Sequence, residues 1–178
     1  DISGLVDIDD AAYDALPPTR WPISNKRNGG RFFADGQFFH ADKKAKFIPV
    51  THRPPVAKTE PRYPFRLNTG RIRDQWHTMT RSALSPRLSS HLAEPFLDIH
   101  PDDAEKIGVA AADLIEVNNP SGRAILRARI TDDVPVGQVF APIHWTGETA
   151  PSARIDALVP GEVDPVSGQP ELKAAVAA

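Results

Sequence analysis

A short basic stretch around Thr69 and Gly70 carries the residue types best suited to binding a ligand. The strand-like segment FRLN ends at this Thr-Gly turn, and Arg71 follows directly. A glycine before an arginine lets backbone N–H groups approach an anion, which the guanidinium group then holds with two hydrogen bonds. Trp76 and His77 add an aromatic face and a ring donor. Together these groups suit a ligand that contains both phosphate and a heterocyclic ring.

The same stretch also stands out by its charge. Six arginines and a single acid, Asp74, lie between Arg62 and Arg87, in a chain whose formal net charge is −2. Two interpretations of this basic window stay open at this point. It is either an anion-binding site or a solvated basic turn beneath which Trp76 packs as a core anchor.

The composition limits the classes of function. The chain has 178 residues, of which 40% are hydrophobic and 25% charged, and this is ordinary for a soluble globular protein. There is no apolar run long enough to span a bilayer and no strong net charge, so we expect neither a membrane nor a nucleic acid as partner. The absence of cysteine excludes disulfides and thiolate metal sites. With no catalytic triad order, phosphate-binding loop or metal-ligand spacing, we expect no catalytic or metal-binding residue.

Residues 1–62 predict an arm and a hairpin rather than a second core. Residues 1–20 hold five aspartates and indicate a solvated, poorly ordered arm. Two pairs of phenylalanines flank Asp35-Gly36, which is typical of a β-hairpin, and KAKFIPV at 44–50 predicts a further short strand. The proline-rich segment 51–64 indicates an extended linker. We expect this region to pack on the rest of a larger parent protein.

Residues 63–178 predict a compact, mainly β domain with short helices. Strands are expected at 65–68, 96–100, 113–118, 123–131 and 137–145; the second alternates apolar and polar residues as a half-buried strand does, and the last is nearly all apolar and therefore central. Pro101 and Gly108 bracket a short helix. We also expect one helical turn within 71–77 and a short helix around 87–91. Periodicity alone indicates a mobile tail after residue 146.

Several motifs in a fixed order carry a resemblance to a known family. They are TGR with WHTMTR, then FLDIHPDDAEKIGV, DLIEVNNPSGRAILRARI, GQVFAPIHW and VDPVSGQPELKA. From about Tyr63 to Ala178 the chain resembles the C-terminal molybdopterin-dinucleotide-binding domain of molybdenum oxidoreductases, the dimethyl sulfoxide reductase superfamily. The pair His144-Trp145, the tail motif and the upstream GRFFADGQFFHADKKAKF look most like the assimilatory nitrate reductases.

The resemblance implies a fold and a set of binding residues. The fold would be a six-stranded double-psi β-barrel (aspartate-decarboxylase-like), with a tail that returns to the cofactor. The residues that match the family's binding positions are Thr69, Gly70, Arg71, Trp76, His77, Thr78, Trp145, Asp156 and Lys173. Asp156 departs from the pattern, because many relatives have Asn there; Asp accepts from a pterin N–H edge but repels phosphate. We expect His144 to be structural.

The resemblance also implies a parent enzyme. The domain would anchor bis-molybdopterin guanine dinucleotide for the reduction of nitrate to nitrite at molybdenum, while an iron–sulfur cluster would lie in other domains of the parent. Its partners would be those domains and an electron-donor protein or domain, in the cytoplasm. The fragment alone is expected to be inactive. Two alternatives remain: the same domain of a formate dehydrogenase catalytic subunit, and a stand-alone double-psi barrel that serves as a recognition module.

Overall fold

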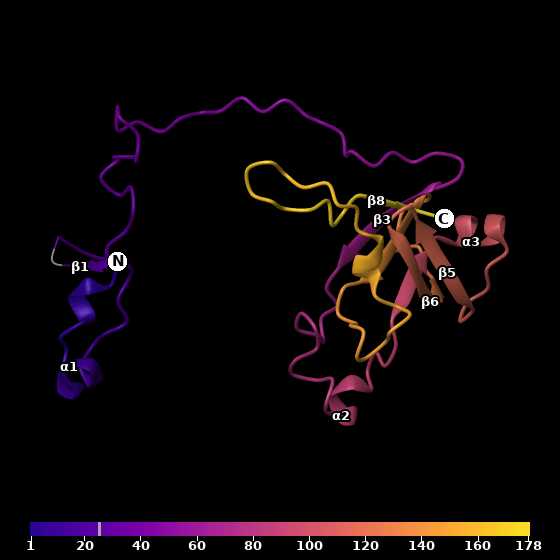
Figure 1. Cartoon of the computed structure of the whole chain (residues 1–178), viewed down its shortest axis with the longest axis horizontal. Helices are drawn as coiled ribbons and strands as arrows, with labels where there is room; N and C mark the ends of the chain where they lie inside the picture. The colour runs from indigo at the N-terminus through magenta and orange to yellow at the C-terminus, as the bar shows by residue number, and fades with distance from the viewer. Residues whose placement is uncertain (25) are drawn as a thin grey trace. The chain divides into compact units, whose positions relative to one another are not determined.

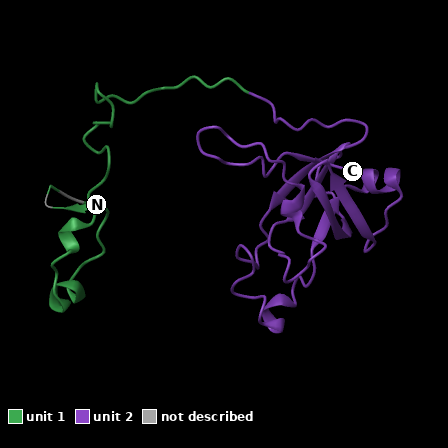
Figure 2. Cartoon of the chain, viewed as in Figure 1, with its two compact units in different colours: residues 1–52 green, residues 53–178 purple. Residues whose placement is uncertain are grey.

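A computed structural model describes residues 1–24 and 26–178, which divide into two compact units, residues 1–52 and 53–178 (Figure 2). The linker residues after His52 belong to the second unit by their contacts. The backbone N–H of Val56 donates to the carboxylate of Glu171, and Arg66 donates to the carbonyl oxygen of Ala57 at 2.7 Å. None of the described helices is both long and apolar enough to cross a membrane.

The first unit contains a few short elements. They are η1 (Ser3–Leu5), α1 (Asp10–Asp14) and the antiparallel pair β1 (Ile23–Ser24) and β2 (Arg27–Asn28). The predicted arm is therefore partly helical. Its helix α1 begins where the Asp9 side chain accepts a hydrogen bond from the Ala12 N–H at 2.8 Å, which satisfies a backbone donor of the first turn. No side chain of α1 is buried.

The predicted hairpin and the strand that follows it are both wrong. A turn does form, with the Gly36 N–H donating to the Phe33 carbonyl, but no strands flank it. Phe33 has a φ of 60°, and its ring stacks on that of Phe38 with the centroids 4.8 Å apart, so the aromatic rings contact each other in a turn instead of across a strand ladder. Residues 44–50 form no strand, since no neighbouring strand pairs with them, and Phe47 is 97% exposed.

A curled six-stranded sheet forms the second unit (Figure 1). In spatial order the strands are β5 (Leu114–Asn119), β6 (Gly122–Ile130), β4 (Phe96–Ile99), β7 (Gln138–Pro142), β3 (Phe65–Gly70) and β8 (Ala175–Ala177). The pairs β3–β7 and β4–β6 are parallel, and the other neighbours are antiparallel. The prediction of a mainly β domain with short helices is confirmed, and β7 is central as expected.

The two edge strands of this sheet meet at one point. Asn118 of β5 and Ala178, which follows β8, exchange two backbone hydrogen bonds of 3.0 and 2.9 Å. The side chain of Asn119 reinforces this junction, because its amide nitrogen donates to the carbonyl oxygens of Leu158 and Val176. The tail is therefore anchored in the sheet, in contrast to the mobile tail that periodicity alone indicates.

The core lies inside the curl of the sheet. On β6 the side chains of Ala124, Leu126 and Ala128 are buried, as their alternation predicts. The strand β4 differs from its prediction, since all four of its residues are buried and not only every second one. Asp98 is buried because Arg129 binds its carboxylate through two hydrogen bonds of 2.5 and 2.8 Å.

Three short helices connect the strands. The helix α3 (Pro101–Ile107) begins at its proline and ends at Gly108, whose φ is 74°, as predicted. The helix α2 (Pro86–Ser89) confirms the element expected around 87–91, and η2 (Ile155–Leu158) lies in the tail. Residues 71–77 form turns and no helix. The strand β8 lies beside β3 in Figure 1.

Candidate functional site

The site begins where β3 ends, and the C-terminal tail completes it. The hydroxyl group of Thr69, which is 1% exposed, donates to the carbonyl oxygen of Leu172 at 2.5 Å. The ammonium group of Lys173 donates to the carbonyl oxygen of Thr69, 104 residues earlier in the sequence. Two residues predicted as binding residues from opposite ends of the domain therefore lie together.

Gly70 occupies a position where a side chain does not fit. A Cβ atom there would lie 2.7 Å from Cε2 of Phe140 and 3.4 Å from Nζ of Lys173. The backbone at Gly70 stays in the sheet, since its carbonyl oxygen accepts from the Ile143 N–H at 2.9 Å. The missing side chain thus leaves room both for the β3–β7 packing and for the lysine ammonium group at the end of the strand.

His144 holds the loop that follows β3. Its Nε2 atom accepts from the backbone N–H of Ile72 at 2.9 Å, and its Nδ1 atom contacts the carbonyl oxygen of His77 at 2.6 Å. Because the carbonyl can only accept, Nδ1 carries the proton and donates. The ring is fully buried. One imidazole therefore joins both ends of the 72–77 loop to the segment after β7, and His144 is structural, as expected.

The loop presents its predicted binding side chains to solvent. Arg71, His77 and Thr78 are exposed. Trp76 is 48% exposed, so it is not the core anchor that one interpretation required. Its ring lies edge-on to the ring of His77, with centroids 4.5 Å apart, and the guanidinium carbon of Arg81 lies 5.5 Å from the Trp76 centroid. A ring face and several donors therefore stand on the outer side of the loop.

The backbone of this loop includes unusual conformations that expose these side chains. His77 and Met79 have φ values of 43° and 61°, in the left-handed region that residues other than glycine rarely adopt. The Met79 side chain is only 4% exposed, so it packs in the interior directly after the predicted binding residues His77 and Thr78. With this backbone, His77 and Thr78 lie on the surface, while the side chain of Met79, the next residue, is buried.

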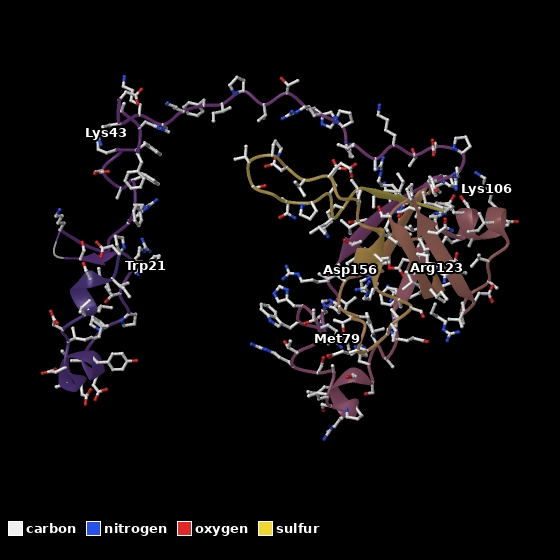
Figure 3. The ribbon with its side chains drawn as sticks, in the orientation of Figure 1. Trp21, Lys43, Met79, Lys106, Arg123 and Asp156 are labelled. Carbon is white, nitrogen blue, oxygen red and sulfur yellow. The ribbon has the colours of Figure 1, made fainter. Side chains whose placement is uncertain are left out.

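The structure does not bring the two remaining predicted residues to the loop surface. Trp145 is only 5% exposed, and its ring centroid lies 6.4 Å from that of His144, so Trp145 is buried next to the histidine that binds the loop. Asp156 projects from η2 (Figure 3) and lies 4.0 Å from Arg154. Within residues 1–24 and 26–178, no recorded hydrogen bond or ion pair connects Asp156 with Thr69, Arg71 or Lys173.

Positive charge is available at this site. Neither Arg71 nor Lys173 forms an ion pair with a carboxylate among the described residues. Two cationic groups, the backbone at a glycine and the hydroxyl and imidazole donors of the loop suit an anionic ligand that carries a ring. Sequence reasoning missed one contributor: Phe140, whose ring packs against Gly70, sits in a strand that looked like ordinary core.

Comparison with known proteins agrees with this geometry. The family model described as molydopterin dinucleotide binding domain matches residues 65–176. A nitrate reductase of Klebsiella oxytoca is 40% identical over 97% of this chain, which covers 20% of that protein. The F420-dependent formate dehydrogenase subunit alpha of Methanocaldococcus jannaschii is 32% identical over 86% of this chain and 22% of that protein.

The fold has a counterpart among solved structures. The acetylene hydratase from Pelobacter acetylenicus superposes with a TM-score of 0.58 at 20% identity, over 65% of this chain and 18% of that chain. The chain spans about a fifth of the length of the curated relatives named above. The match of the family model spans residues 65–176, which is more than half of the chain and includes the site at the end of β3, and the chain therefore belongs to the molydopterin dinucleotide binding domain family.

Proposed function

We propose that this domain holds molybdopterin guanine dinucleotide in a molybdenum-dependent nitrate reductase. The observation that carries the proposal is the meeting of Lys173 with Thr69 and Gly70, next to the exposed Arg71. Lys173 reaches the end of β3 from the tail, and Arg71 directly follows β3 in the sequence. This arrangement fits a pyrophosphate, whose two negative charges need convergent donors.

Different residues of the chain would bind different parts of the dinucleotide. Arg71 and Lys173 neutralise the phosphates, and the backbone at Gly70 approaches them closely because it carries no Cβ. His77 and Thr78 donate to oxygen atoms of the ligand, and the Trp76 ring offers a face to one of its heterocycles. Asp156, as an acceptor, suits the N–H edge of a pterin. The cofactor supplies the metal and its redox chemistry, and the domain supplies binding and orientation.

The parent enzyme follows from the relatives. We infer a cytoplasmic, assimilatory-type enzyme that reduces nitrate to nitrite, with an iron–sulfur cluster and an electron donor outside this chain. A nitrate reductase at 40% identity supports nitrate over formate, for which the relative is 32% identical. A stand-alone recognition module is less well supported, because both of these relatives are oxidoreductases by name. The parallel pairs in the curled sheet support a double-psi barrel.

The proposal is tested by cofactor content in the full-length enzyme. Arg71→Met keeps the length of the side chain and removes its charge, and it should lower the molybdenum and pterin retained per protein. A charge-assisted bidentate contact contributes about 1.5–3 kcal/mol, which corresponds to roughly a tenfold to hundredfold loss of affinity. Arg71→Lys should fall between, because lysine keeps the charge without the fork.

The matched control is Arg123→Met. Arg123 is an exposed arginine of β6 (Figure 3) that forms an ion pair of 3.5 Å with Glu116 and is not among the residues assigned to the cofactor. It should retain wild-type cofactor content. If Arg71→Met also retains the wild-type content, or if Arg123→Met loses as much, the basic loop is a solvated surface and the site assignment fails.

A further inference from the structure

A second basic feature lies beyond the residues of the proposed cofactor site. A hollow of about 460 Å³ opens between the loop after β3 and the helix α2. It is lined by Arg73, Asp74, Arg81, Ser82, Arg87, Leu88 and His91. None of these residues is among those assigned above to the dinucleotide, so the function proposed so far leaves the hollow without a role.

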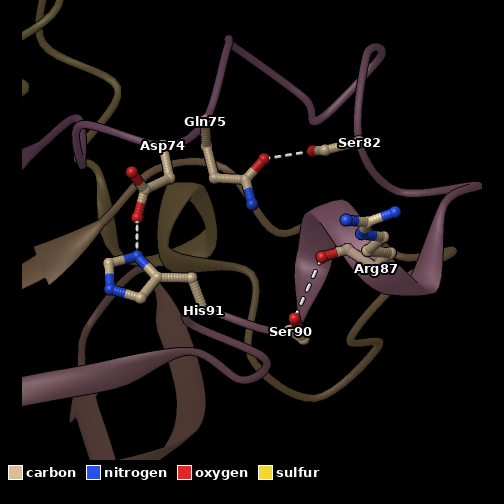
Figure 4. A network of polar contacts seen from close by, with 6 residues as sticks. All are labelled: Asp74, Gln75, Ser82, Arg87, Ser90 and His91. Atoms are coloured by element: carbon tan, nitrogen blue, oxygen red, sulfur yellow. Dashed lines mark hydrogen bonds and ion pairs between the residues drawn. The ribbon is translucent and has the colours of Figure 1, made fainter.

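The positive charge of this hollow is not balanced by the protein. Its single acid, Asp74, is bound to Nδ1 of His91 (Figure 4). Among the described residues, no carboxylate forms an ion pair with Arg73, Arg81 or Arg87. The guanidinium group of Arg81 lies over the ring of Trp76. Three guanidinium groups against one carboxylate leave a net positive hollow, which favours an anion.

The wall of the hollow is held in place by hydrogen bonds. The hydroxyl of Ser82 donates to the side-chain oxygen of Gln75, and the hydroxyl of Ser89 donates to the Ser82 carbonyl at 2.7 Å. These bonds join the loop to α2, which bears Arg87 (Figure 4). The arginines thus project from a framework whose backbone is already fixed, and binding an anion would require ordering only their side chains.

An unsatisfied donor lies next to the hollow, on Gln75, which is bonded to the lining residue Ser82 but does not itself line the hollow. The Nε2 atom of Gln75 is buried and has no hydrogen-bond partner among the described residues, while its Oε1 atom is bound to Ser82. A buried donor without a partner is unfavourable, and such groups are rare in folded proteins. In Figure 4 this nitrogen is directed toward the side of the loop on which His91 and Arg87 lie.

We propose that the hollow lined by Arg73, Arg81 and Arg87 is a second binding site, for an oxyanion. Guanidinium groups match the oxygen atoms of phosphate, nitrate or sulfate with two parallel hydrogen bonds each. The excess of positive charge favours a dianion over a monoanion. The ligand is either a free inorganic oxyanion or the phosphate group of a nucleotide, and both present the same oxygen atoms. The site does not depend on the dinucleotide assignment.

Titration of the 178-residue chain tests the site. Sodium phosphate at pH 8, sodium nitrate and GMP are added separately at constant ionic strength, and the Nε–H signals of the arginines are followed by NMR. Saturable shifts are expected at Arg73, Arg81 and Arg87, with phosphate binding more tightly than nitrate. Arg87→Met should weaken the apparent affinity about tenfold, as the loss of one charge-assisted contact predicts. Arg123→Met should leave the affinity unchanged, and urea unfolding checks that both variants fold.

The outcomes separate this site from the dinucleotide site. If Arg87→Met weakens the affinity about tenfold and Arg71→Met leaves it unchanged, the hollow is the site whether or not the dinucleotide proposal holds. If only Arg71→Met weakens the affinity, the anion binds at the end of β3 and the hollow is refuted. Shifts that rise without saturation, equally at Arg123, also refute it. Tighter binding of GMP than of phosphate identifies a nucleotide as the source, and equal or weaker binding identifies a free ion.

Discussion

Replacing His144 by phenylalanine should destabilise the domain through two backbone groups that lose their partner. The imidazole is fully buried, accepts from the Ile72 N–H at 2.9 Å and donates to the His77 carbonyl at 2.6 Å. Phenylalanine fills nearly the same space and makes neither bond. The change therefore isolates the hydrogen bonds from the packing of the ring, and leaves one donor and one acceptor of the loop unpaired.

The size of the effect follows from the cost of these groups. A buried polar group left without its partner costs about 1–3 kcal/mol. Both hydrogen bonds here are partly buried, so the loss of the two should cost about 1–3 kcal/mol in total. A domain of this kind has a total stability of about 5–15 kcal/mol. With a urea dependence of about 1–3 kcal/mol per molar, the midpoint of unfolding should fall by about 1 M. His144→Gln retains a donor and an acceptor on one amide, and should fall between.

The assay combines urea unfolding with amide hydrogen exchange. Trp145 is buried beside His144 and reports unfolding by fluorescence. The amide of Ile72 reports the loop itself, and it should exchange faster in His144→Phe than in the wild type. The matched control is His52→Phe, because His52 is exposed and lies in the first unit. Its free energy of unfolding should stay within about 0.5 kcal/mol of the wild type, as for most surface substitutions.

One result would refute this reasoning. If His144→Phe unfolds at the wild-type urea concentration and the Ile72 amide exchanges at the wild-type rate, then the imidazole does not hold the loop. The arrangement of His77 and Thr78 would then have another cause, such as the buried Met79 side chain.

Two further predictions concern the end of β3 and the tail. Gly70→Ala should lower the free energy of unfolding by about 1–3 kcal/mol and weaken the affinity for the dinucleotide, because its Cβ would lie 2.7 Å from Phe140 and crowd Lys173. The control is Gly161→Ala, whose Cβ would have no atom within 4 Å. It should change neither the urea unfolding nor the cofactor retention. Hydrogen bonds from the Ser167 backbone, the Ser167 hydroxyl and the Val166 backbone hold the pKa of Asp164 below its usual range. These bonds therefore stabilise the tail turn at pH values above the ordinary aspartate pKa, and this stabilisation is lost as the pH falls through the lowered pKa. An NMR titration of the Asp164 carboxyl carbon with an ordinary midpoint would contradict this.

Local signals predicted the local parts of this fold. The hairpin β5–β6 followed from a turn sequence between two strand-like segments, and α3 followed from Pro101 and Gly108 at its two ends. These elements are determined by residues a few positions apart. The double role of His144 was not predictable in this way, because it depends on Ile72, which is 72 positions away.

The predictions that were wrong also concern contacts between residues far apart in the sequence. The burial of Asp98 depends on Arg129, 31 positions later, so an alternating pattern alone indicated a half-buried strand. Residues 44–50 have the composition of a strand but no neighbouring strand to pair with. The predicted binding residues came from the chemistry of the basic stretch and from the family resemblance. The structure brings Lys173 of the tail to Thr69 at the end of β3, a contact between residues 104 positions apart.

The position of β3 between β7 and β8 has a consequence for the rate of folding. Both of its neighbours come much later in the chain, and its contact with Lys173 closes a separation of 104 residues. Long-range pairs form slowly because the intervening chain must first lose its freedom, whereas a hairpin such as β5–β6 forms early. We therefore expect the proposed dinucleotide site to be among the last parts of the molecule to form. Insertion of the cofactor would then be limited by how fast the tail reaches β3, and not by the assembly of the core.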